Sequence, residues 1–426
     1  MIKKIPIIDL FAGPGGLGEG FMSVKDKSGE SVFDIKLSIE KDKDAHKTLT
    51  WRSFFRQFVK VNKKVPEEYY DAIREPILSK REQIIEETLD NYEEGRVARE
   101  EARLVELGSK KWSSEQVDEL IRSKLEGAQK WVLIGGPPCQ AYSNVGRSRV
   151  GGIDKDDHRV YLYQEYLRII KKHKPAIFVM ENVQGLLSAS VEGEKVFDWM
   201  KRDLTDGDNY TIHSLVRPVE KDSDYLIKSE NYGVPQMRHR VILLGVRKDY
   251  SHQKEYLERK ETVSLEAVVE GLPPVRSGLN RRFTQHDKVN RGATGKPNRL
   301  YSNVEDSDEN WITLFKENAE KIKGWGEFKG FSKPIERAEL QTGSEFIPNT
   351  DSTAPPKALK DWYLDNRLNG VANHQSRAHL TQDLLRYLFA TMYVKKHNRF
   401  PRLEDFVHHS EELLPDHANA ESGKFT

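Results

Sequence analysis

The chain has 426 residues, of which 37% are hydrophobic and 32% charged, with one cysteine and a formal net charge of +1. The length predicts two domains, or one large domain with insertions, and the small net charge means that any surface for nucleic acid has to be local. One cysteine excludes an intrachain disulfide and a zinc site built from several cysteines. Because the sequence has no run of about 18 apolar residues and residues 1–4 lead directly into a strand, we expect a soluble protein of the cytoplasm.

The first predicted element is a buried strand, residues 5–11, followed by a glycine-dense turn and the start of a helix. Strand, glycine-rich turn and helix in this order are typical of a nucleotide-binding βα unit, since glycine lets a ligand approach the backbone. A dinucleotide site is the competing interpretation. Residues 34–40 predict a second strand that ends on Glu40, a carboxylate that either hydrogen-bonds ribose hydroxyls or is solvated at the strand end.

Residues 52–128 are highly charged and poor in glycine, and their apolar residues recur at intervals of three and four. This periodicity predicts amphipathic helices. We interpret the segment as a helical hairpin inserted into the fold, with charged faces that are solvated or that contact DNA or a partner protein.

The only cysteine, Cys139, follows the apolar run 131–134 and the sequence Gly-Gly-Pro-Pro. The run predicts a short buried strand, so the cysteine lies at its exposed end, where glycines admit a substrate and prolines stiffen the turn. Such a cysteine is either a nucleophile or a small structural hydrophobe. The basic, glycine-containing residues 144–152 suit a loop that closes over a substrate.

The next buried strand, residues 175–180, ends on Glu181. Because ligands of open α/β sheets bind at the carboxyl ends of the strands, Cys139 and Glu181 form a suggestive pair, although an acid here can also cap the next turn. Further along, Arg238 and Arg240 precede a buried strand and point to the same side of an extended chain. They form either a binding pair or a surface ladder.

Beyond residue 250 the pattern is less regular. Residues 276–299 contain seven lysines or arginines against one acid, Asp287, which favours contact with phosphate groups over a merely solvated basic loop. Tryptophans and phenylalanines separated by glycine and proline predict a small irregular domain, from which a major-groove reader would come. A helix that begins near Leu380 is expected to be packed.

Four stretches, in this order along the chain, resemble the motifs of the DNA (cytosine-5)-methyltransferases. They are the cofactor motif Asp9–Gly16, the nucleophile motif Gly136–Gln140, the base-binding motif Glu181–Val183 and the Gln-x-Arg-x-Arg motif Gln236–Arg240. The resemblance covers residues 5–250 firmly. It implies an α/β fold, with a Rossmann-like S-adenosylmethionine-dependent methyltransferase sheet over residues 1–250, interrupted by the helical segment 52–128, and a smaller, irregular target-recognition region over 251–426.

The resemblance implies methyl transfer from S-adenosylmethionine to C5 of a cytosine flipped out of double-stranded DNA. Cytosine C5 is a poor nucleophile, and addition of the Cys139 thiolate to C6 would make it enamine-like. A buried carboxyl would hydrogen-bond N3, which suits Glu181. A guanidinium would bind O2, and the motif assigns this role to Arg240 with Arg238 in support.

The remaining assignments also follow from the resemblance. Cofactor-binding positions are Phe11, Ala12, Gly13, Pro14, Gly15, Gly16, Glu40, Pro138 and Leu162. Substrate or DNA positions are Gln140, Ser143, Arg147, Asn182, Gln236, Arg281 and Arg282. No metal is implied, and the acid that usually follows the third strand and meets the adenine of the cofactor has no assignment.

The family's closing Gly-Asn-x-x-x-Pro motif does not occur after Phe400. We therefore expect that the chain is truncated, is completed by a second polypeptide, or is a defective relative. The resemblance implies a bacterial restriction–modification or defence system, with a cognate restriction endonuclease as a possible partner. The alternatives are a tRNA cytosine-5 methyltransferase and a catalytically weak or non-catalytic DNA-binding subunit, whereas the Pro-Cys motif argues against a NAD-type dehydrogenase.

Overall fold

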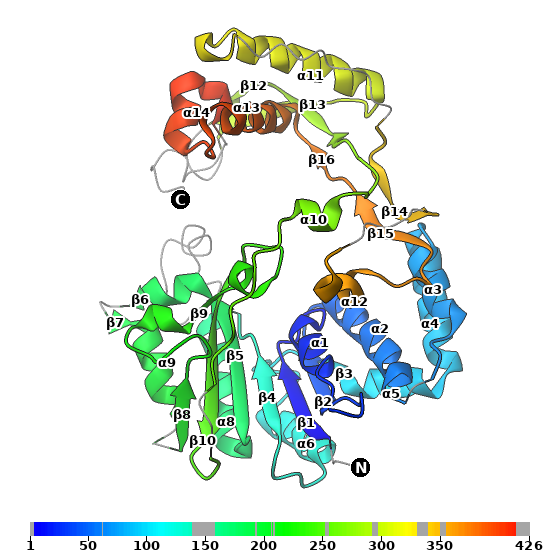
Figure 1. Cartoon of the computed structure of the whole chain (residues 1–426), viewed down its shortest axis with the longest axis vertical. Helices are drawn as coiled ribbons and strands as arrows, with labels where there is room; N and C mark the ends of the chain where they lie inside the picture. Colours follow the sequence, from blue (N-terminus) through cyan, green and yellow to red (C-terminus); the bar gives the residue numbers. More distant parts are fainter. Residues whose placement is uncertain are drawn as a thin grey trace. The chain divides into compact units, whose positions relative to one another are not determined.

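The structure is a computed structural model that describes residues 4–61, 63–138, 158–191, 194–205, 207, 209–251, 255–291, 297–329, 340–349 and 355–414. The chain divides into two compact units (Figure 1). The sheet unit comprises residues 1–72, 77–270 and 354–359, and the C-terminal unit comprises residues 73–76, 271–353 and 360–426. None of the described helices is both long enough and apolar enough to cross a membrane.

The sheet unit is built on one mostly parallel sheet with strand order β3-β2-β1-β4-β5-β10-β8, in which β9 pairs with β10. The five strands from β3 to β5 run parallel, and β10 is antiparallel to its neighbours. The bounds are β1 Ile5–Leu10, β2 Phe33–Glu40, β3 Ala102–Leu104, β4 Val132–Gly135, β5 Ile177–Val183, β8 Tyr210–His213, β9 Leu226–Lys228 and β10 His239–Arg247.

Both faces of the central strands are buried, which explains their continuous apolar sequences. Neighbouring residues of β1 point to opposite faces, so Ile7 and Ile8 belong to two different hydrophobic clusters. On the Ile8 face the sheet packs against α6 (Ser114–Leu125), α8 (His158–His173) and α9 (Val196–Leu204). On the Ile7 face it packs against α1 (Gly16–Met22). The predicted Rossmann-like layering is confirmed.

The short elements of this unit lie between β5 and the end of the unit. They are η1 Gln184–Ser188, β6 Ser190–Val191, β7 Glu194–Lys195, η2 Asp222–Tyr225, η3 Ser229–Tyr232, α10 Glu266–Val269 and η5 Lys357–Leu359.

The charged segment that follows β2 is helical, as its periodicity predicts, but it is not a hairpin. It contains α2 (Lys43–Lys60), α3 (Glu67–Arg74), α4 (Leu78–Asn91) and α5 (Glu93–Glu101). After them come β3, a strand of the sheet, and α6, a helix that packs on the sheet. The Arg56 guanidinium of α2 is buried and pairs with Glu101 of α5 and Glu19 of α1. This ion-pair network joins the inserted helices to the helix that follows the glycine-rich turn.

The C-terminal unit combines short two-stranded pairings with a small helical core. Its elements are β11 Gly278–Leu279, β12 Arg281–Arg291, β13 Pro297–Asn303, α11 Asp308–Lys323, η4 Gly326–Phe328, β14 Gly343–Pro348, α12 Lys360–Tyr363, β15 Gly370–Gln375, β16 Ala378–His379, α13 Thr381–His397, α14 Leu403–His409 and η6 Glu411–Leu413. The predicted packed helix is α13, whose Phe389 and Tyr393 are buried.

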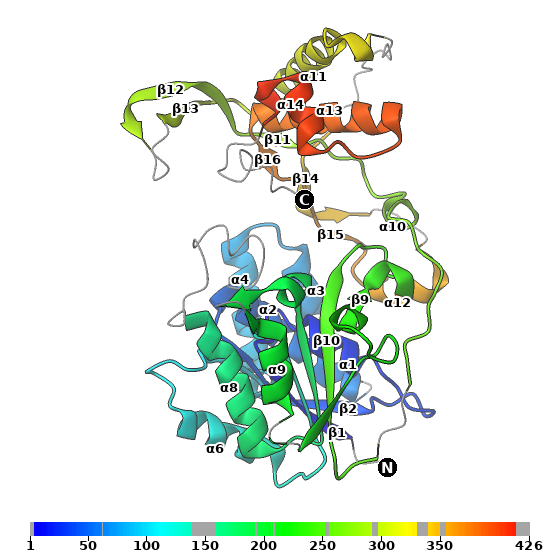
Figure 2. The same ribbon diagram turned by 90° about the vertical axis from the view of Figure 1, so that its left-hand side faces the viewer.

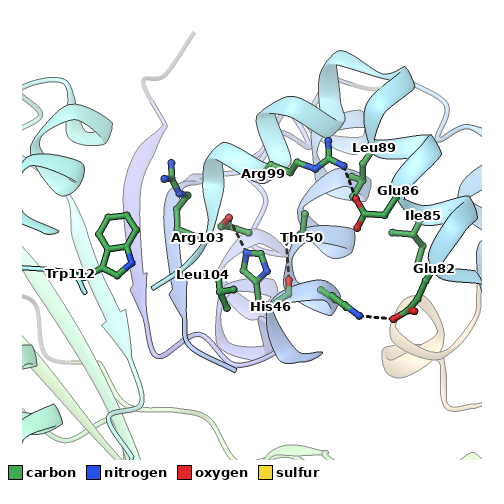
Figure 3. A pocket seen from close by; sticks show the side chains of 12 residues that line it. His46, Thr50, Glu82, Ile85, Glu86, Leu89, Arg99, Arg103, Leu104 and Trp112 are labelled. Atoms are coloured by element: carbon green, nitrogen blue, oxygen red, sulfur yellow. Dashed lines mark hydrogen bonds and ion pairs between the residues drawn. The ribbon is translucent and has the colours of Figure 1, made fainter. Parts of the chain in front are cut away.

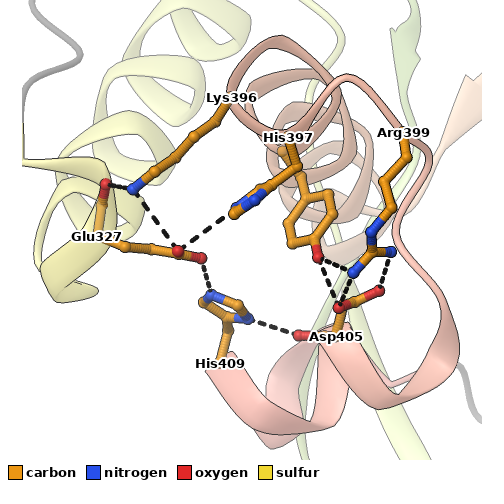
Figure 4. A network of polar contacts seen from close by, with 7 residues as sticks. Glu327, Lys396, His397, Arg399, Asp405 and His409 are labelled. Atoms are coloured by element: carbon orange, nitrogen blue, oxygen red, sulfur yellow. Dashed lines mark hydrogen bonds and ion pairs between the residues drawn. The ribbon is translucent and has the colours of Figure 1, made fainter.

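Polar contacts hold the helical core together at one end (Figure 4). Glu327 of η4 forms an ion pair with Lys396 of α13 (3.5 Å) and a hydrogen bond with the His409 ring of α14. Asp405 of α14 accepts a hydrogen bond from the Tyr393 hydroxyl at 2.6 Å and pairs with Arg399 at 2.8 Å. Every charged group of this network has a partner, so it stabilises the helix packing.

Candidate active site and cofactor pocket

The glycine-rich turn after β1 uses backbone conformations that suit glycine. Gly13 and Gly15 have φ values of 57° and 92°, and Gly15 is the N-cap of α1. Phe11 also has a positive φ, 56°, which is uncommon for a residue with a side chain and often marks a functional position. The turn therefore holds an aromatic side chain in a strained conformation at the carboxyl end of the first strand.

Glu40, at the end of β2, is tied to this turn. Its carboxylate accepts hydrogen bonds from the backbone N–H groups of Gly13 (2.7 Å), Lys41 (2.8 Å) and Asp42 (2.7 Å). Glu40 is thus not a solvated strand-end acid. A carboxylate has about four lone-pair sites, so one acceptor position remains for a ligand.

A small pocket of about 120 Å³ opens between the ends of β1, β2 and β4. Four of its lining residues are predicted cofactor positions: Phe11, Glu40, Pro138 and Leu162. Five were not predicted: Ile39, Lys41, Val105, Leu107 and Gly136. The other predicted cofactor residues, Ala12, Gly13, Pro14, Gly15 and Gly16, form the turn and do not line this pocket.

The acid nearest to the end of the third strand is Glu106. Val105 and Leu107 line the small pocket directly after β3, and the residue between them is Glu106, whose carboxylate lies 3.4 Å from the Lys41 ammonium. β3 has only three residues. Such a short strand carries no periodic signal, and the preceding helical pattern hides it from sequence reasoning.

Asp9, the last residue but one of β1, is fully buried, and neither carboxylate oxygen has a hydrogen-bond partner among the described residues. Burial raises the pKa of its carboxyl to about 8, against a smaller opposing effect of Arg56. Its Oδ2 would lie 3.2 Å from a Cβ at Gly18, so the absence of a side chain there gives the acid its space. A neutral Asp9 is available as a hydrogen-bond donor beside the turn.

The predicted catalytic residues come from adjacent strands. Glu181 lies near the end of β5 and Arg240 near the start of β10, and the Arg240 Nε is 2.5 Å from the Glu181 Oε1. The side chains are 29% and 23% exposed, so the carboxyl is only partly buried, not fully buried as the proposed chemistry favours. The other carboxylate oxygen would be 3.0 Å from a Cβ at Gly136. Glu181 therefore lies against the turn that leads to Cys139.

The structure does not bring all predicted residues to this place. Arg238 and Gln236 are exposed, and Arg238 does not share the ion pair of Arg240. Asn182 is buried, and its side-chain oxygen accepts a hydrogen bond from the Val183 N–H at 2.8 Å. Cys139, Gln140, Ser143 and Arg147 lie outside the described residues.

In the C-terminal unit, the basic stretch divides into two kinds of arginine. Arg276 is buried, and its guanidinium donates to Asp306 and Asp308 at 2.6 Å each. The prediction that Arg276 contacts phosphate is therefore wrong, because two acids that lie some 30 residues further along the chain neutralise its charge. Arg281 and Arg282 are both exposed on β12, but Arg282 lies 3.8 Å from Glu317, so Arg281 is the one that remains a candidate for contact with DNA.

A larger pocket, of about 620 Å³, lies among the inserted helices and β3 and was not predicted (Figure 3). Charged side chains at its wall are paired with one another, as in Lys47 with Glu82 (2.5 Å) and Arg99 with Glu86 (2.8 Å). It contains no residue of the four motifs. The smaller pocket, by contrast, lies at the carboxyl ends of the parallel strands, where ligands of open α/β sheets bind.

The glycine-rich turn after the first parallel strand, the acid at the end of the second and the pocket between them define a Rossmann-like methyltransferase fold. The model of the C-5 cytosine-specific DNA methylase family matches residues 109–383, which is more than half of the chain and includes Cys139, Glu181 and Arg240. The chain belongs to this family.

Individual relatives are similar over part of their length. The chain is 33% identical over 308 residues to the type II methyltransferase M.Bpa9945I of Bacillus paralicheniformis, over 66% of this chain and 64% of that protein. It is 28% identical over 255 residues to M.BspRI of Lysinibacillus sphaericus, over 60% and 47%. A solved DNA modification methyltransferase encoded within an E. coli prophage is similar with a TM-score of 0.38 and 20% identity, over 68% and 62%. The chain thus spans less than two thirds of these curated relatives.

Proposed function

We propose that the chain is a DNA (cytosine-5)-methyltransferase that uses S-adenosylmethionine and double-stranded DNA in a bacterial restriction–modification system. The observation that carries the proposal is the Glu181–Arg240 ion pair, which joins two separate motifs, together with the contact of Glu181 with Gly136 of a third. Two groups that the reaction needs at one cytosine thereby lie together at one edge of the sheet, beside the turn that precedes Cys139 in the sequence. A restriction endonuclease of the same specificity is the partner that such a system requires.

The small pocket suits the adenosine part of S-adenosylmethionine, which supplies an electrophilic methyl group when bound. Phe11, Pro138 and Leu162 offer apolar walls for a flat base, and the free acceptor position of Glu40 suits a ribose hydroxyl. Glu106 follows β3 and pairs with Lys41, which lines the pocket, and it is the acid that we propose as acceptor for the exocyclic amine. A pocket of about 120 Å³ is too small for the whole cofactor, so the methionine end extends past the glycine-rich turn.

The residues at the strand ends would act on the base in turn. The Cys139 thiolate would add to C6 of the cytosine and move electron density toward C5. C5 could then take the methyl group that bound S-adenosylmethionine would supply, with the methyl–sulfur bond breaking and the neutral thioether leaving. Loss of the C5 proton to a base then expels the thiolate and restores the aromatic ring. Glu181 would hold N3, and Arg240 would hold O2 with a guanidinium nitrogen that is free, since its Nε faces Glu181 and its Nη1 donates to the His239 carbonyl at 2.8 Å.

Transfer of a labelled methyl group tests this function. The full chain is incubated with tritiated S-adenosylmethionine and either mixed-sequence duplex DNA or tRNA, and the nucleosides are separated after digestion. We expect label in 5-methyldeoxycytidine and none after Cys139→Ser. Label in RNA alone would replace DNA by tRNA as the substrate, and no label in either nucleic acid would refute an active methyltransferase.

A further inference from the structure

The strands β12 and β13 form a long antiparallel ribbon that projects from the helices of the C-terminal unit (Figure 2). Phe283 is directly opposite Tyr301, but a bulge follows, and His286 is then opposite Arg299. Opposed residues share a face, and residues two apart on one strand share a face. The bulge therefore brings His286 to the face of Phe283, which strict alternation would not predict.

One face of the ribbon, which we call the cationic–aromatic face, carries Arg281, Phe283, His286, Arg299 and Tyr301, with Asn303 opposite Arg281 at its base. The rings of Phe283 and Tyr301 are 6.3 Å apart. The guanidinium of Arg281 lies 5.4 Å from the Tyr301 ring and that of Arg299 lies 5.5 Å from the Phe283 ring. Two planar cations thus flank one aromatic pair, and stacking restricts their orientation before any ligand binds.

The opposite face is turned toward the helices of its own unit. Arg282 and Ser302 line a hollow of about 290 Å³ together with Leu314 of α11 and Thr381 of α13. The Arg282 guanidinium also lies 3.8 Å from Glu317 of α11. Among the described residues, Arg281 has no such carboxylate partner. Of Arg281 and Arg282, Arg281 on the cationic–aromatic face is therefore the one that is available to a ligand.

We propose that the cationic–aromatic face enters the major groove of the DNA substrate and that Arg281 and Arg299 read guanine bases there; the inference rests on the proposed DNA substrate. A two-stranded ribbon fits the major groove, and the guanidinium fork matches O6 and N7 of guanine. The described part of the ribbon carries five arginines or lysines against one acid, which favours a polyanion. Stacking on the rings restricts the orientation of both guanidiniums. Readout of a base edge requires a defined orientation, whereas contact with a phosphate does not.

Adjacent arginines on opposite faces give a matched experiment. The full-length protein selects bound duplexes from a random-sequence library at fixed salt, and the wild-type preference is compared with those of Arg281→Lys, Arg299→Lys and the control Arg282→Lys. All three variants keep the charge and lose the fork. We expect Arg281→Lys and Arg299→Lys each to lose on the order of 10- to 100-fold preference at one G·C pair, with unchanged binding to non-specific DNA. Arg282→Lys should keep the wild-type preference.

A further variant tests the role of stacking. Tyr301→Leu removes the ring beneath Arg281 and should weaken the preference only at the pair that Arg281→Lys affects. Circular dichroism confirms that each variant is folded. Relaxed preference in Arg282→Lys with wild-type preference in the other two would overturn the proposal, as would a wild-type protein that selects no sequence. Since selection requires no methyl transfer, its outcome is independent of the tritium assay.

Discussion

Alanine substitutions at the neighbouring Gly135 and Gly136 should have different effects. The first should disturb the packing of the sheet, and the second should disturb the geometry of the candidate active site. A Cβ at residue 135 would lie 2.6 Å from the backbone oxygen of Leu10 and 3.0 Å from the Tyr166 ring. Neither neighbour can retreat, because one is backbone of β1 and the other is fully buried. We expect Gly135→Ala to lower the free energy of unfolding by about 1–3 kcal/mol.

A Cβ at residue 136 would instead meet the Glu181 Oε2 at 3.0 Å, so the carboxyl would have to move by a few tenths of an ångström. Such a shift loosens the 2.5 Å contact with Arg240 but leaves the packed interior intact. Since misplacement of a reacting group by about 1 Å costs about 100-fold in rate, we expect Gly136→Ala to lower the methyl-transfer rate about 10-fold with stability nearly unchanged.

Urea unfolding and single-turnover methylation of both variants measure the two effects separately. A Gly136→Ala protein with the wild-type rate would refute the position of Glu181 against the turn. A Gly135→Ala protein as stable as the wild type would refute the close approach of β1 and β4 at this residue.

Other expectations concern charges in the sheet unit. The pKa of the Asp9 carboxyl is raised to about 8, so the folded state holds a proton that the unfolded state releases above pH 3.8. The free energy of unfolding should therefore fall by on the order of 5 kcal/mol as the pH rises from about 4 to 8. Urea unfolding of Asp9→Asn should show no such dependence on pH. Arg56→Met should destabilise the protein by about 3–5 kcal/mol because it leaves the buried Glu101 carboxylate without its cation and with only the hydrogen bond from Gln57, whereas Arg96→Met, in an exposed network, should cost under about 1 kcal/mol. Glu40→Gln should weaken S-adenosylmethionine binding in calorimetry by about 10-fold, and unchanged affinity would contradict a role for this carboxylate in holding the cofactor.

The sequence was most informative where the local pattern and the tertiary structure agree. Continuous apolar runs predicted the central strands, and the residues after them, such as Glu40 and Glu181, lie at one edge of the sheet because parallel strands share their direction. The ion pair of Glu181 with Arg240 follows from the register of β5 with β10, which no local pattern contains.

The misses have physical reasons as well. Arg276 was counted with the phosphate-binding residues, but in the folded unit it is neutralised by Asp306 and Asp308, which are distant from it in the sequence. No acid was assigned after the third strand, where Glu106 lies, because three residues of strand carry too little alternation to be recognised. His286 would be placed on the wrong face of its ribbon by simple alternation, since a bulge shifts the register by one residue.

The most direct test of the proposed chemistry is to trap the bond between Cys139 and the base. The full chain is incubated with S-adenosylmethionine and duplex DNA that contains 5-fluorocytosine, whose fluorine cannot leave as the C5 proton does. We predict a protein–DNA adduct that survives denaturation, maps to Cys139 by mass spectrometry, is lost in Cys139→Ser and forms more slowly in Glu181→Gln. Methylation of ordinary duplex DNA without any adduct on its 5-fluorocytosine counterpart, or an adduct that persists in Cys139→Ser, would contradict the account.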